Sequence, residues 1–87
     1  MPTYAVQRNL PGITMEQLGD AQKAAIETAE RHTLEGTPVR YIRSNFYPED
    51  ARCTCLFEGP DAVSVEQVNR EAGIPFEKVE EVLDLVP

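Results

Sequence analysis

Two segments of this chain end alike and decide its fold: AERHTLEGTP at Ala29–Pro38 and VNREAGIP at Val68–Pro75. In each, a helix-forming run reaches a glycine, the residue that most readily adopts the left-handed conformation found just after a helix. A proline two residues later prevents the helix from resuming. The chain is therefore predicted to run twice through the order helix, stop, strand.

The start of each predicted helix can also be read from spacing. Alternating apolar and polar residues predict a strand over residues 3–8, and a Pro-Gly turn ends it. Thr14 and Gln17 then have the spacing of a capping box, which places the first helix start at Thr14. Ser64 and Gln67 repeat this spacing and predict the start of the second helix at Ser64.

The segment between the helices is predicted to be a hairpin with strands at residues 39–47 and 51–58. We expect Ile42 to lie opposite Cys55, because this register gathers the apolar side chains on one face. That face holds Ile42, Phe46, Cys53, Cys55 and Phe57. The other face is then expected to carry Tyr41, Arg43, Asn45, Arg52, Thr54, Leu56 and Glu58.

Residues 76–86 complete the sheet as a fourth strand in this interpretation, although their carboxylates are also compatible with a helix. The order βαββαβ places both helices on one face of a four-stranded antiparallel sheet, an α+β, ferredoxin-like sandwich. Residues 1–87 are read as a single domain. So small a chain gains from burying its open sheet face against a second copy, so we expect a homodimer.

Composition excludes several classes of partner. A formal net charge of -7 argues against nucleic acid and anionic membranes, which attract basic surfaces. The chain contains no run of about twenty apolar residues, and its first residues lack the apolar stretch of a signal peptide. We therefore expect a cytoplasmic protein. Its two cysteines, on one side of a strand, are expected to stay reduced.

Three residues are candidate metal ligands: Cys53, Cys55 and His32. Two thiolates on one side of a strand suit soft transition-metal ions, but a structural zinc site takes four protein ligands. A complete site would then need carboxylates or a second copy of the chain. The alternative interpretation is that the cysteines are small buried residues of the core. His32 lies on the inner stripe of the first helix, where a lone histidine is more often a packed and hydrogen-bonded side chain than a ligand.

Tyr41, Arg43 and Arg52 are candidate residues for binding a small anionic or polar ligand. Guanidinium groups match carboxylates and phosphates with two parallel hydrogen bonds. The alternative is that these arginines pair with acidic residues of a second copy in a dimer. No Ser-His-Asp set, Cys-His set or glycine-rich phosphate loop is present, so no residue is assigned a catalytic role.

From Tyr41 onward the chain resembles a family of small bacterial proteins classed as a domain of unknown function. The resemblance is carried by Val39–Ser44, Phe46, Pro48–Asp50, Cys55–Glu58, Pro60, Ala72–Phe76, Val79 and Val82. It implies a ferredoxin-like dimer and, because one member binds nickel, a divalent transition metal as a bound ion. Val68 and Arg43 stand where members often have histidine.

Two functions from different classes follow as hypotheses. The first is a small cytoplasmic, dimeric binding protein of this nickel-binding-type family. The second is a dimeric α/β-barrel enzyme in which two open sheets enclose a small anionic or polar substrate. Convergent Cys, His or carboxylate ligands would favour the binding protein, and a closed polar cavity between two sheets would favour the enzyme. A purely structural interaction module would show neither.

Overall fold

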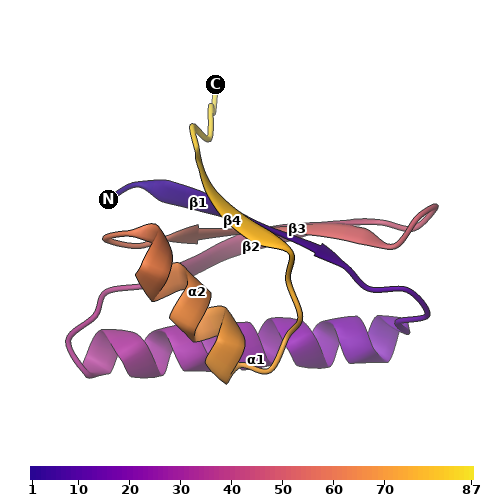
Figure 1. Ribbon diagram of the computed structural model, residues 1–87, viewed down its shortest axis with the longest axis horizontal. Coiled ribbons are helices and arrows are strands. Elements are labelled where there is room, and N and C mark those ends of the chain that lie inside the picture. Colours follow the sequence, from indigo (N-terminus) through magenta and orange to yellow (C-terminus); the bar gives the residue numbers. More distant parts are fainter.

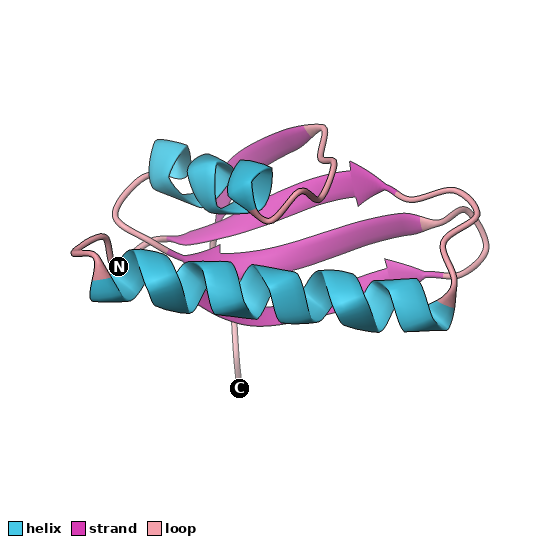
Figure 2. Ribbon diagram, turned by 90° about the horizontal axis from the view of Figure 1, so that it is seen from below, coloured by secondary structure: helices cyan, strands magenta, loops and turns pink.

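Two helices and four strands make up the chain, and the computed structural model describes all 87 residues. Their bounds are β1 (Thr3–Asn9), α1 (Met15–Leu34), β2 (Arg40–Tyr47), β3 (Arg52–Glu58), α2 (Ala62–Glu71) and β4 (Lys78–Val82). The strands form one antiparallel sheet in the order β2-β3-β1-β4, and both helices cover the same face (Figures 1 and 2). The predicted ferredoxin-like order βαββαβ is confirmed.

Both helices end at the predicted glycines. Gly36 follows α1 with a φ of +108°, and Gly73 follows α2 with a φ of +75°. At the end of α1 the Thr37 N–H donates to the His32 carbonyl over 2.9 Å, which satisfies a carbonyl that has no partner within the helix. Neither helix is both long enough and apolar enough to cross a membrane.

The start of α1 agrees with the prediction, and the start of α2 does not. The Thr14 side chain accepts from the Gln17 N–H, and the Gln17 side chain accepts from the Thr14 N–H, which completes the capping box. In α2 the cap is Asp61, whose Oδ1 accepts from the Ser64 N–H over 2.8 Å. A carboxylate is favoured at a helix N-terminus by its charge, so α2 begins three residues earlier than expected.

The hairpin register differs from the prediction by two residues. Ala51, expected at the start of a strand, lies in the turn with a φ of +60°, and its N–H donates to the Tyr47 carbonyl over 2.9 Å. Pairing therefore begins one residue further along the second strand. Ser44, rather than Ile42, lies opposite Cys55.

A β-bulge at Ile42 changes the face on which Tyr41 lies. Pairing shifts between Tyr41 and Arg43, so Tyr41 lies opposite Phe57 on the face covered by the helices. The two rings meet edge to face, with 5.4 Å between their centroids. The prediction that placed Tyr41 on the open face is wrong, because one extra residue reverses the alternation beyond it.

The last strand is shorter than the predicted span of residues 76–86. It pairs only with β1, and the last pair joins Val82 to Thr3, at the start of β1. Beyond that pair the segment has no neighbouring strand, so it leaves the sheet on the side away from the helices (Figure 1). Leu83 and Leu85 are 83% and 88% exposed there.

The core lies between the helices and the sheet. Four of its side chains are completely buried: Val6 of β1, Phe57 of β3, and Val65 and Val68 of α2. Val6 and Phe57 share one face of the sheet, as their register with Cys55 and Tyr4 requires. This packing fixes the position of β3, and β3 carries both cysteines.

Candidate functional site at a buried cysteine pair

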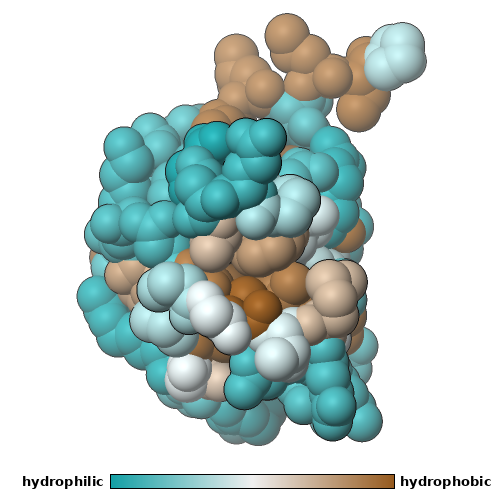
Figure 3. Space-filling model, turned by 90° about the vertical axis from the view of Figure 1, so that its right-hand side faces the viewer, coloured by the Kyte–Doolittle hydropathy of each residue, from teal (hydrophilic) through white to brown (hydrophobic).

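A pocket of about 300 Å³ opens between α1 and the sheet. Ten of its fourteen lining residues are hydrophobic, and the lining comes from α1, from β1, β2 and β3, and from the loops that follow β1 and α2. Figure 3 views the end of the molecule where α1 begins and shows an apolar hollow surrounded by more polar residues. Cys53 and Cys55 both line this pocket, so it brings the predicted thiols next to space for a ligand.

The two cysteines lie on the helix-covered face of β3, as predicted. They are 3% and 6% exposed, and their Sγ atoms are 3.8 Å apart. Both thiols are free. Because side chains two residues apart on a strand point the same way, the two sulfur atoms face the same region.

Arg8 is the charged member of the site and was not predicted. It lies opposite Cys53 in the sheet and is only 3% exposed. Its Nε donates to Cys55 Sγ over 3.4 Å, its Nη2 donates to Asn69 Oδ1 over 2.7 Å, and its Nη1 donates to the Pro75 carbonyl over 3.5 Å. A guanidinium therefore lies inside the core and directly contacts one of the two sulfur atoms.

A chain of hydroxyl groups connects the surface of α1 to Cys55. Gln22 Nε2 donates to the Tyr41 hydroxyl over 2.9 Å, and the Tyr41 and Ser44 hydroxyls are 2.7 Å apart. Ser44 Oγ donates to Cys55 Sγ over 2.9 Å. If Tyr41 donates to Ser44, every hydroxyl proton in the chain is used, and the sulfur accepts the last of them.

These contacts lower the pKa of one thiol and raise the pKa of the other. A hydrogen bond from Cys53, together with the charge of Arg8 and the Ser44 hydroxyl, lowers the pKa of Cys55 to about 5 in spite of its burial. The same bond to Cys55, with burial and the negative charge on Cys55, raises the pKa of Cys53. These contacts therefore favour the thiolate form of Cys55 and the thiol form of Cys53.

His32 does not lie with the cysteines. It is in the last turn of α1, whereas the pocket is lined by the first half of that helix. Its Nε2 is 2.8 Å from Glu71 Oε2, and Arg31 donates to the other oxygen of Glu71, an arrangement that lowers the pKa of Glu71. No group of three or more His, Cys, Asp or Glu side chains is placed to hold a metal ion.

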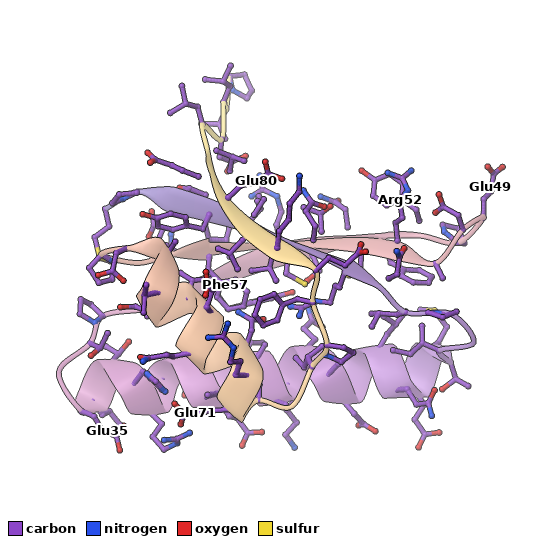
Figure 4. All side chains as sticks on the ribbon, in the orientation of Figure 1. Glu35, Glu49, Arg52, Phe57, Glu71 and Glu80 are labelled. Carbon is purple, nitrogen blue, oxygen red and sulfur yellow. The ribbon has the colours of Figure 1, made fainter.

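Tyr41, Arg43 and Arg52 do not form a common site either. Tyr41 lines the pocket, on the opposite face of the sheet from the two arginines. Arg43 donates to both oxygens of Asp84, over 2.8 and 2.9 Å. Arg52 donates to Asp50 and lies 4.2 Å above the ring of Tyr47, on the side of the sheet away from the helices (Figure 4).

Comparison with known proteins agrees with this architecture. A sequence model of the nickel responsive protein SCO4226-like family matches residues 4–82. The chain belongs to this family. The crystal structure of SCO4226 from Streptomyces coelicolor A3(2) superposes with a TM-score of 0.81 at 25% sequence identity, covering 97% of this chain and 99% of that one. None of the curated proteins compared with the chain matches it.

The family match confirms the resemblance of this chain to that family of small bacterial proteins. Sequence reasoning missed two members of the site, Arg8 and Ser44. Arg8 continues the alternation of Tyr4 and Val6 and so belongs to the same face of β1, a signal that was available. Ser44 was hidden by the predicted register, which placed it opposite Cys53 instead of Cys55.

Proposed function

We propose that the protein is a small binding protein that captures a thiophilic ligand in the pocket at Cys53 and Cys55. The observation that carries this proposal is the pair of sulfur atoms, 3.8 Å apart, at the wall of an apolar pocket of about 300 Å³. A thiolate is the form of cysteine that binds metals and reacts with electrophiles, and Arg8 and Ser44 stabilise it on Cys55.

Packing alone does not explain these contacts. Cysteines that only fill a core need no charged partner, and burying a guanidinium beside them costs free energy unless it is compensated. A ligand that bonds to sulfur would use the thiolate that Arg8 stabilises. The lining residues Leu18 and Phe46 would contact its apolar part.

Nickel is the ion that the name of the family suggests. In this chain, nickel held by both sulfur atoms would find no third protein ligand within the same group of side chains. Val68 and Arg43 cannot supply an imidazole. We therefore expect nickel to bind weakly to a single chain, with solvent or a second copy completing its coordination.

Phenylarsine oxide tests the pocket directly, because its arsenic bonds to two neighbouring thiols with loss of water and its phenyl ring suits an apolar cavity. We expect one equivalent to bind per chain, to raise the melting temperature, and to protect both cysteines from iodoacetamide. Cys53→Ser and Cys55→Ser should each abolish this protection. The matched control His32→Gln keeps both thiols and should behave as the wild type. Full alkylation of both cysteines in the presence of the arsenical would refute the proposal.

We also propose that the protein acts as a cytoplasmic homodimer that joins through the open face of the sheet. A reducing compartment suits two free thiols. The segment after β4 carries Leu83, Leu85 and Val86, each at least 73% exposed, above this face. A second copy would remove these side chains from water.

Light scattering coupled to gel filtration tests the dimer. The double variant Leu83→Ser/Leu85→Ser should shift the protein from dimer to monomer. Val63→Ser is the matched control, because Val63 is 59% exposed on α2, away from the open face, and its loss should leave the dimer intact. A wild type that is monomeric at micromolar concentration would rule out the dimer.

A further inference from the structure

The charge of Arg8 limits which ion the cysteine pair can hold. Arg8 forms no ion pair with any carboxylate, and its other partners, the Asn69 amide and the Pro75 carbonyl, carry no net charge. The nearest group that can carry a compensating negative charge is therefore sulfur. This buried positive charge acts on any metal ion that the two sulfur atoms bind.

The sum of charges differs between monovalent and divalent ions. Two thiolates contribute two negative charges and Arg8 contributes one positive charge, so a monovalent cation makes the site neutral. A divalent cation leaves one uncompensated positive charge in a pocket where ten of fourteen lining residues are hydrophobic. Because an uncompensated buried charge is costly, the site favours the monovalent ion.

The number of ligands leads to the same conclusion. With metal–sulfur bonds of about 2.3 Å, sulfur atoms 3.8 Å apart subtend an angle of about 110° at the metal. A linear arrangement would need them about 4.6 Å apart. The angle therefore fits a trigonal or a tetrahedral ion alike, and the number of ligands is what narrows the choice: no third protein ligand is grouped with the cysteines, so the site suits an ion that needs few protein ligands. Thiolates prefer soft ions, of which Cu(I) is the monovalent biological example.

We propose that Cys53 and Cys55 form a site for a single monovalent copper ion, with Arg8 as the group that makes the occupied site neutral. This inference rests on the proposed ligand pocket and names the ion that the pocket selects. The pocket beside the sulfur atoms leaves room for one further small neutral ligand at the remaining coordination position.

An anaerobic titration with Cu(I) against the chelator bicinchoninate tests the site in the reduced protein. We expect one Cu(I) per chain, with Ni(II) and Zn(II) bound at least about 100-fold more weakly under the same conditions. Cys53→Ser and Cys55→Ser should each lower the affinity for Cu(I) at least about 100-fold. His32→Gln is the control and should keep the wild-type affinity. Circular dichroism checks that each variant is folded.

The pair Arg8→Met and Arg8→Lys separates charge from structure. Met fills a similar volume without a charge, so the preference for Cu(I) over Zn(II) should fall about 10-fold or more in that variant. Lys keeps the charge and should keep the preference. A merely structural role for Arg8 would change stability without changing the ratio of the two affinities.

Three outcomes would overturn the copper site: equal affinity for Ni(II) or Zn(II), Cu(I) binding that survives Cys53→Ser, or Cu(I) preference unchanged in Arg8→Met. If a serine variant does not fold, methylthiolation of both thiols in the folded wild type replaces it and should abolish Cu(I) binding. If phenylarsine oxide binds and Cu(I) does not, only the copper site is refuted. If neither binds, the proposed pocket function is refuted as well.

Discussion

The shared proton of the cysteine pair predicts how the stability of the folded protein changes with pH. In the folded protein the pKa of Cys55 is lowered to about 5 and that of Cys53 is raised, so the pair holds one proton across the neutral range. In the unfolded chain both thiols titrate near about 8.5, and the pair holds two protons at neutral pH.

The sign of the effect follows from this proton count. Between about pH 5 and about pH 8.5 the unfolded state binds one more proton than the folded state, so the free energy of unfolding rises with pH. The slope is about 1.4 kcal/mol per pH unit, or about 2 kcal/mol between pH 6 and pH 7.5. Above about pH 9 the unfolded pair holds fewer protons than the folded one, and the slope reverses.

Urea denaturation followed by circular dichroism measures this slope. The wild type and the double variant Cys53→Ala/Cys55→Ala are compared at several pH values, with a reductant present throughout. The variant keeps His32 and all carboxylates, so the difference between the two proteins isolates the cysteine pair. That difference should increase by about 2 kcal/mol from pH 6 to pH 7.5. Curves that stay parallel over this range would refute the shared-proton arrangement.

Four further substitutions test the fold. Gly73→Ala should destabilise the protein by about 1 to 2 kcal/mol, because Gly73 has a positive φ. Gly19→Ala inside α1 should stabilise it by about 1 kcal/mol, because a Cβ there meets nothing within 4 Å. Urea denaturation should therefore show changes of opposite sign for the two variants. Phe57→Ala removes a completely buried ring and should cost about 3 to 5 kcal/mol in the same assay; a loss below 1 kcal/mol would contradict the core described here. Thr14→Ala removes the capping box and should cost about 1 kcal/mol, and hydrogen exchange should speed up only in the first turn of α1.

The sequence allows the positions of both cysteines to be predicted, but not the contact between Arg8 and Cys55. The spacing of Cys53 and Cys55 placed both sulfur atoms on one side of a strand, and the structure agrees. Arg8 could have been assigned to the same face from its alternation with Val6. That its guanidinium contacts Cys55 could not be predicted, because the contact depends on how β1 pairs with β3, some forty-five residues apart in the chain.

The register of the hairpin could not be predicted from the local sequence pattern. Apolar patterning favoured Ile42 opposite Cys55, but the turn takes in Ala51 and a bulge occurs at Ile42. Both are local departures from regular strand geometry: the turn at Ala51 is closed by the Tyr47 carbonyl and accepts the Leu10 N–H, and the bulge turns Tyr41 toward the helices. The pairing of Tyr41 with Phe57 brings their rings into edge-to-face contact, and a period-two pattern contains no information about it.

The sequence by itself determined the order of elements, the left-handed stops at Gly36 and Gly73, and the start of α1 at Thr14, because each depends on residues within one or two helical turns. Only the tertiary structure decided where β4 ends and which groups surround the cysteines. A strand ends where its neighbour does, and a buried charge is placed by the elements that pack around it. Those contacts join residues distant in the chain, so they exist only once the sheet and helices have come together.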